Sequence, residues 1–111
     1  MTHKMKLQTS PFYSIKSGTK TVEMRLYDEK RQLIKVGDEI EFTLFNGTDT
    51  IYCVVEGINR FSDFSQLYKH YDKSALGYTD TQVASPSDMS QYYKDEDIKR
   101  YGVVAIEIKL K

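Results

Sequence analysis

The chain has little of what cross-links a small protein. Its 111 residues include one cysteine, Cys53, and two histidines, His3 and His70. One cysteine excludes a disulfide framework, and no Cys or His spacing is typical of a zinc site, so we expect neither a metal nor another cofactor. The length is sufficient to bury a core without such cross-links, and we expect one domain over residues 1–111. Cys53 lies in an apolar run and is expected to be a small buried side chain.

Long hydrophobic runs and an excess of one charge are also missing. No stretch approaches the roughly 20 apolar residues that a membrane span needs, and no apolar run follows the N-terminus as in a signal peptide. We therefore expect no membrane association and, with a lone cysteine, a reducing cytoplasm. Sixteen basic residues balance sixteen acidic ones. This balance argues against a protein that binds along duplex DNA by charge alone. A local basic patch or a pocket for a small ligand is compatible with this balance.

The pattern of apolar residues predicts an alternation of strands and short helices. Ser-Pro pairs at positions 10–11 and 85–86, and Ser62, predict helix starts, and the acids-then-bases order of residues 95–101 is typical of a further helix. Residues 73–84 have no periodicity and are expected to form a long loop. The strands are expected at residues 5–8, 21–26, 39–45, 50–55 (or 50–58, if the strand continues) and 103–110, the last with one apolar and one polar face.

Turn residues specify how these strands connect. Asn46-Gly47 predicts a tight hairpin between the third and fourth strands, and Gly57 predicts a bulge in the fourth. A tight hairpin favours an antiparallel or mixed sheet over a doubly wound parallel one. Several short, bent, half-polar strands are typical of closure into a small barrel. The expected fold class is therefore α+β, a small mixed β-barrel of about five strands with short flanking helices.

The strand at residues 21–26 is unusual because ionisable groups crowd onto it. Gly18 is placed to end the preceding helix in the left-handed conformation. Strand periodicity then puts Val22, Met24 and Leu26 on a core face, and Glu23 and Arg25 on the opposite face. That polar face must meet water or a lined cavity.

Two interpretations of this charged face remain open. It is either a solvated surface, with ion pairs worth under about 1 kcal/mol each, or a polar cavity in which a lysine beside a carboxylate meets a ligand. Regular pleating would place Lys20 on the side opposite Glu23. Lys20 can share a cavity with Glu23 only if the turn after Gly18 takes it off the regular strand.

Tyrosines supply most of the aromatic content, with nine Tyr, five Phe and no Trp. Tyrosine rings pack in cores and also stack on nucleic-acid bases. Tyr92 and Tyr93 are expected to face opposite ways, one into the core and one along a cleft. Glu96 is expected either to begin the last helix or to reach the charged strand.

The motif Gly-x-Lys-x-x-Glu-x-Arg, formed by Gly18, Lys20, Glu23 and Arg25, resembles the signature of the ASCH domain family. Residues 15–28 (IKSGTKTVEMRLYD), 36–42 (VGDEIEF) and the C-terminal part from 92 to 108 carry the resemblance in order. It implies a small barrel similar to PUA domains, with a cleft beside the motif, and an RNA, nucleotide or nucleoside ligand. It designates Gly18, Lys20, Glu23, Arg25 and Tyr93 as ligand-binding residues.

One branch of the family consists of small amidohydrolases acting on N4-acetylcytidine, and another includes a ribonuclease. The amidohydrolase motif has a lysine at the place of Lys20, a threonine nucleophile where this chain has Glu23, and a later glutamate; this chain has no glutamate between Glu56 and Glu96.

Two functional hypotheses follow. In a binding domain, Lys20 and Arg25 contact phosphate or base edges, Glu23 accepts from an exocyclic amine, and a tyrosine stacks. In a hydrolase, Lys20 and Glu23 are catalytic and handle protons, while Arg25 stabilises negative charge. Lys20 and Glu23 tips within about 4 Å in an enclosed pocket would favour chemistry. An open groove with Arg25 exposed would favour binding.

Overall fold

A computed structural model describes all 111 residues, and its backbone forms one five-stranded sheet with short helices around it. The elements in chain order are β1 (Thr2–Leu7), α1 (Thr9–Lys16), β2 (Val22–Leu26), the 3₁₀ turn η1 (Arg31–Leu33), β3 (Glu39–Leu44), β4 (Thr50–Phe61), α2 (Phe64–His70), the 3₁₀ turn η2 (Pro86–Gln91), α3 (Asp95–Tyr101) and β5 (Val103–Leu110).

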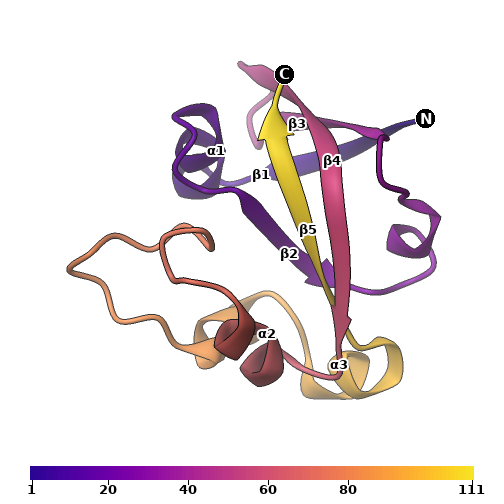
Figure 1. Ribbon diagram of the computed structural model, residues 1–111, viewed down its shortest axis with the longest axis vertical. Helices are drawn as coiled ribbons and strands as arrows, with labels where there is room; N and C mark the ends of the chain where they lie inside the picture. The colour runs from indigo at the N-terminus through magenta and orange to yellow at the C-terminus, as the bar shows by residue number, and fades with distance from the viewer.

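The sheet is mixed and strongly curled. Its strand order is β1-β3-β4-β5-β2, with β1 and β3 parallel and all other neighbours antiparallel. In Figure 1, β2 and β4 run toward α2 and α3 with β5 antiparallel between them, while β1 and β3 lie at the other end beside α1. The predicted α+β class and small barrel of about five strands with short flanking helices are confirmed, in the form of a half-closed barrel.

One side chain spans the gap between the two edge strands. The guanidinium of Arg25 on β2 donates from Nη2 to the backbone carbonyl of Lys6 on β1, at 3.1 Å. Because β1 and β2 are the unpaired edges of the sheet, this contact joins the two sides of the opening.

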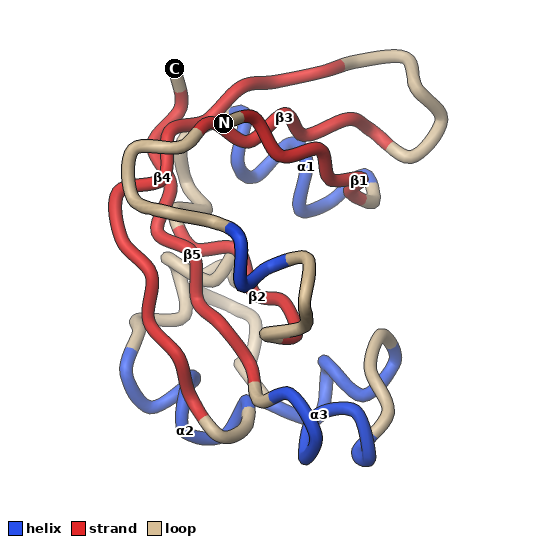
Figure 2. The backbone as a smooth tube through the Cα atoms, turned by 90° about the vertical axis from the view of Figure 1, so that its right-hand side faces the viewer, coloured by secondary structure: helices blue, strands red, loops and turns tan.

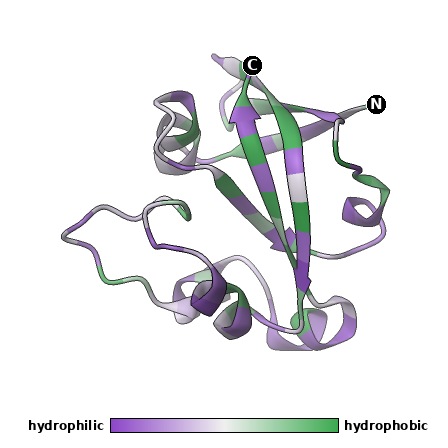
Figure 3. Cartoon of the chain, in the orientation of Figure 1, coloured by the Kyte–Doolittle hydropathy of each residue, from purple (hydrophilic) through white to green (hydrophobic).

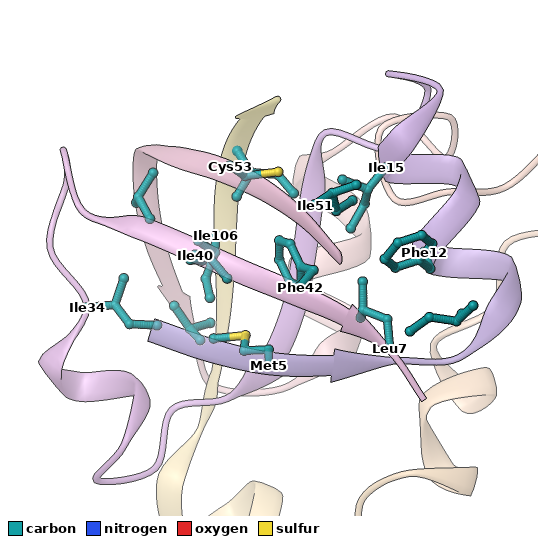
Figure 4. Packing of buried hydrophobic residues seen from close by; sticks show 14 residues of the cluster. Met5, Leu7, Phe12, Ile15, Ile34, Ile40, Phe42, Ile51, Cys53 and Ile106 are labelled. Atoms are coloured by element: carbon teal, nitrogen blue, oxygen red, sulfur yellow. The ribbon is translucent and has the colours of Figure 1, made fainter. Parts of the chain in front are cut away.

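The sheet buries apolar side chains on both of its faces. The first core cluster lies inside the curl and includes Phe12 and Ile15 of α1 with Phe42 and Ile106 of the sheet (Figure 4). The second lies on the opposite face, where Phe64 and Leu67 of α2 pack against the sheet. Figure 2 places α1 against β1 and β3, and places α2 and α3 at the other end of the molecule.

The prediction that β5 has one apolar and one polar face was wrong, because β5 is apolar on both faces over most of its length. Val104, Ile106 and Ile108 join the first cluster, but Val103 and Ala105 join the second. Apolar residues therefore follow one another along the strand, and Figure 3 shows hydrophobic bands along β4 and β5. The reason is that β5 lies between β4 and β2 in the interior of the sheet, where helices or strands cover both faces.

Several predicted boundaries were wrong by a few residues. β1 spans Thr2–Leu7 instead of residues 5–8, and Gln8 rather than Ser10 precedes α1. Asp63, not Ser62, caps α2, and its carboxylate accepts the Gln66 backbone N–H at 2.9 Å. The segment after Ser85 forms only a 3₁₀ turn. β4 continues to Phe61, three residues beyond the longer predicted range.

Both predictions from turn residues were correct. A hairpin around Gly47 joins β3 to β4, and the β4–β5 register shifts between Val55 and Gly57, as a bulge requires. Residues 73–84 form turns and irregular backbone, as predicted, but Leu76 within them is buried in the second cluster.

Candidate functional site

The backbone after α1 brings Lys20 to Glu23. Gly18 leaves the helix with φ +85°, the left-handed conformation predicted for it. The backbone N–H groups of Thr21 and Val22 then both donate to the carbonyl of Ala75, at 3.0 Å. Because two consecutive N–H groups share one acceptor, the chain is not regularly pleated here. Lys20 therefore leaves the strand pattern, and its Nζ lies 3.6 Å from Glu23 Oε1.

Glu23 is a buried carboxylate whose acceptor sites are almost fully used. Its Oε1 accepts the backbone N–H of Met24 at 3.1 Å. Its Oε2 accepts from Arg25 Nε at 3.2 Å and from Nη2 at 2.9 Å. Glu23 is 4% exposed. Burial by itself would raise the pKa of Glu23, but the positive charges of Arg25 and Lys20, with these hydrogen bonds, bring the pKa below its ordinary value.

Lys20 has far fewer partners than Glu23. The side chain is 7% exposed, and its ammonium donates one hydrogen bond, to the carbonyl of Leu76 at 3.0 Å. The chain passes close because residue 77 is glycine with φ +105°, and a Cβ there would lie 3.1 Å from Lys20 Cδ. Leu76 is 56 residues away in sequence, so this contact is purely tertiary.

Arg25 is held by Glu23 and by the opposite edge strand. Burial lowers the pKa of the guanidinium, but the adjacent Glu23 carboxylate outweighs burial and raises it. Arg25 therefore stays charged at every relevant pH. Its Nε and Nη2 are engaged by Glu23 and by the Lys6 carbonyl, whereas Nη1 donates to no protein group.

These three charged residues lie on the floor of a cavity of about 410 Å³. Its walls come from β1, the start of α1, α2, the loop after α2 and η2; the loop extends beside β2 in Figure 1. Four tyrosines line it: Tyr68, Tyr78, Tyr92 and Tyr93. The volume is in the range of small-molecule sites in proteins, which begins at roughly 300 Å³.

A chain of hydroxyl groups fixes one wall of the cavity. The Tyr78 hydroxyl donates to Asp88 Oδ2 at 2.7 Å and lies 2.8 Å from the Tyr68 hydroxyl. Burial, with these two neighbours, raises the pKa of Tyr78 above its ordinary value. Tyr78 is therefore a neutral hydrogen-bonding group. Because Asp88 lies on η2, the bond ties the loop to that turn.

Tyr93 and Tyr92 agree in part with the prediction that one is core and the other lines a cleft, because Tyr93 packs against the second core cluster but both rings line the cavity. Tyr93 is half-buried and stacks on Phe64, with ring centroids 5.9 Å apart and an interplanar angle of 19°. Tyr92 is 56% exposed, and it too lines the cavity. Burial raises the pKa of the Tyr93 hydroxyl.

The structure brings together Lys20, Glu23, Arg25 and Tyr93 of the residues predicted for the site. Gly18 is exposed and does not line the cavity; it positions the backbone that carries Lys20. Glu96 is exposed in the first turn of α3 and does not reach the cavity. Sequence reasoning missed Tyr78 and Asp88, because neither belongs to a motif and only the loop path joins them.

The geometry bears on both hypotheses. The 3.6 Å between Lys20 and Glu23 in a lined cavity is the arrangement expected for chemistry. However, Glu23 is paired with Arg25 and has a lowered pKa, which makes it a weak proton acceptor at neutral pH. The groups left free to meet a ligand are cationic donors on Lys20 and Arg25.

Neither a metal centre nor a membrane span is evident. No three His, Cys, Asp or Glu side chains gather where they could hold a metal ion. None of the helices has both the length and the apolar character to cross a bilayer. Cys53 is buried, as predicted, and burial raises the pKa of its thiol to about 11.

Comparison with solved structures finds similar chains at over 30% identity. The crystal structure of hypothetical protein PH0355 is 36% identical, with full coverage of both chains and a TM-score of 0.83. The solution structure of PF0455 from Pyrococcus furiosus is 33% identical over 99% of this chain and 97% of its own, with a TM-score of 0.69.

More distant structures share the fold. The ASCH domain from Lactobacillus crispatus is 13% identical over 98% of this chain and 79% of its own, with a TM-score of 0.69. No curated protein matches the chain. The family model of the ASCH domain matches residues 5–111. That match covers the charged strand, the cavity and nearly all of the sheet, and this chain therefore belongs to the ASCH domain family.

Proposed function

We propose that residues 1–111 act as one ASCH domain that binds RNA or a nucleotide in the cavity beside the Gly18–Arg25 motif. The observation that carries the proposal is the floor of the cavity, where a buried cation, Lys20, and a partly buried one, Arg25, share one carboxylate. Tyrosine rings surround this floor. Cationic donors suit phosphate or base-edge acceptors, and tyrosine rings suit the faces of bases.

The roles within the site follow from the contacts. Lys20 and Arg25 have N–H groups available to a ligand, whereas Glu23 mainly holds Arg25 in place. Tyr92 is the ring most accessible for stacking, and Tyr93 forms the inner side of the same wall. The net charge of zero and the size of the cavity favour one or two nucleotides over a long duplex.

A hydrolase acting on a modified nucleoside or on RNA is the second candidate. The 3.6 Å separation of Lys20 and Glu23 in a lined cavity favours it. Glu23 occupies the position of the threonine nucleophile of the amidohydrolase branch, and its carboxylate is held ionised by Arg25. For this reason binding remains the first choice.

One screen tests both candidates. Ribonucleosides, N4-acetylcytidine and short single-stranded RNAs are titrated against the wild type by calorimetry, and the mixtures are then analysed for product. Tyr92→Ala should weaken binding about 5- to 100-fold, as the loss of one stacked base predicts. Tyr52→Ala is the matched control, because Tyr52 is also exposed but lies away from the cavity.

The outcomes separate clearly. Binding that Tyr92→Ala weakens and Tyr52→Ala spares, without product, supports the binding domain. Product formation that Lys20→Ala abolishes would favour the hydrolase. No binding of any compound, or equal losses in the two tyrosine variants, would contradict a ligand site in this cavity.

A further inference from the structure

The charges on the cavity floor do not balance. Lys20 and Arg25 contribute two positive charges, and Glu23 contributes one negative charge. Glu23 accepts all of its short hydrogen bonds from Arg25 and from the backbone N–H of Met24. Lys20, at 3.6 Å from the carboxylate, is outside normal hydrogen-bond distance. The floor therefore carries one surplus positive charge, located at Lys20.

Lys20 is also short of acceptors. An ammonium has three N–H donors, and Lys20 uses one of them, on the neutral carbonyl of Leu76. The side chain is 93% buried, by its 7% exposure, and it lines the cavity. A buried charge that lacks hydrogen-bond partners is costly in free energy. Arg25 Nη1 adds further N–H donors that no protein group accepts.

Building on the proposed function, we propose that the ligand places a singly charged phosphodiester group on this floor, with Lys20 and Arg25 Nη1 as its donors. One negative charge neutralises the surplus positive charge. Lysine and arginine are both common phosphate-binding residues, the first as a point charge and the second as a planar fork. The tyrosines of the same cavity receive the attached base.

The single surplus charge favours a phosphodiester over a neutral nucleoside and over a terminal phosphate. A neutral nucleoside would leave the buried surplus charge unpaired. A terminal phosphate carries about −1.5 to −2 at pH 7, which exceeds the surplus, and Asp88, which also lines the cavity, would repel the excess negative charge. The same phosphodiester chemistry occurs in the linkage between two nucleotides of RNA and in nucleoside cyclic phosphates.

The test compares ligands that share a nucleoside and differ in the phosphate group attached to it. The four ribonucleosides, their 2′,3′-cyclic monophosphates, their 3′-monophosphates and the corresponding dinucleoside monophosphates are titrated by calorimetry at pH 7 and low salt. Lys20→Met removes the charge at nearly constant length. Lys109→Met is the matched control, because Lys109 is exposed on β5 and outside the cavity. Circular dichroism establishes that both variants are folded.

We expect the phosphodiesters to bind the wild type about 10- to 100-fold more tightly than the nucleosides, as one or two hydrogen bonds to a charged group predict. Lys20→Met should weaken phosphodiester binding about 10- to 100-fold more than it weakens nucleoside binding, so that the two classes of ligand bind the variant about equally. Lys109→Met should change neither. Whether the dinucleotides or the cyclic phosphates bind more tightly identifies the source of the group.

Three results would overturn the inference while leaving a nucleoside site intact. The nucleosides could bind the wild type as tightly as the phosphodiesters, the 3′-monophosphates could bind more tightly than either, or Lys20→Met could weaken nucleosides and phosphodiesters equally. If Lys20→Met does not fold, the comparison of nucleosides with phosphodiesters on the wild type decides between these outcomes. Phosphodiester affinity should then fall as the salt concentration rises, because a contact between a cationic side chain and a phosphate is screened by salt. Failure of every compound to bind would overturn the proposed function as well.

Discussion

Replacing the buried carboxylate Glu23 by glutamine should destabilise the fold severely. The change keeps the shape of the side chain but removes the negative charge that pairs with both Lys20 and Arg25. It also presents an amide NH₂ group where Glu23 now accepts hydrogen bonds. Two like charges would then remain on the cavity floor without a counter-charge.

Removing one partner of a buried ion pair costs about 3–5 kcal/mol. We expect the lower end of this range, about 3 kcal/mol, because glutamine keeps one carbonyl oxygen that can accept a hydrogen bond from Arg25. For a domain of this size the melting temperature should fall by more than roughly 10 °C. Urea and thermal unfolding of Glu23→Gln measure both quantities, and Glu56→Gln, an exposed position on β4, is the matched control.

The pH dependence of the free energy of unfolding is a second, independent test of the role of Glu23. The pKa of Glu23 is lower in the folded protein than the ordinary value near 4.5. Its charge therefore stabilises the fold fully above about pH 4.5, and the stabilisation is lost as the pH falls through the folded-state pKa. The difference in unfolding free energy between the wild type and Glu23→Gln should narrow on acidification.

Two results would refute this reasoning. A loss of stability no larger than that of Glu56→Gln would mean that water in the cavity, and not Glu23, compensates the two cations. A difference that widens as the pH falls would mean that the carboxylate is protonated in the folded protein, contrary to its pairing with Arg25.

Two further predictions concern backbone and surface electrostatics. Gly77→Ala should lower stability and weaken ligand binding, because the added Cβ would lie 3.1 Å from Lys20 Cδ. The control Gly47→Ala also replaces a glycine with positive φ but meets open space, so it should lower stability alone. Equal losses of ligand binding in the two variants would contradict the role of the contact between residue 77 and Lys20. Asp38→Asn should reduce the loss of stability below about pH 4, because hydrogen bonds from His3 and the Lys35 backbone lower the pKa of Asp38 to about 2. The free energy of unfolding of both proteins is measured from pH 5 to pH 2. An equal decrease of this free energy in the wild type and the variant would show that the prediction is wrong.

Local patterns predicted the parts of the fold that depend on neighbouring residues. The hairpin around Gly47, the left-handed Gly18 and the apolar face of β2 follow from turn chemistry and from the two-residue period of a strand. Helix starts were less accurate. Asp63 and Ser62 are both good caps in sequence, and only the path of the chain out of β4 selects Asp63.

The amino-acid sequence by itself determined that Glu23 and Arg25 share a polar strand face, because strand periodicity is a local property. Only the tertiary structure decided what that face does. The Ala75 carbonyl takes two consecutive N–H groups and brings Lys20 to the same side, and Leu76, 56 residues from Lys20 in sequence, accepts from its ammonium. Tyr78 and Asp88 close the cavity from the same distant segment. Contacts between segments so far apart leave no periodic signal in the sequence, because the chain path between them sets the geometry.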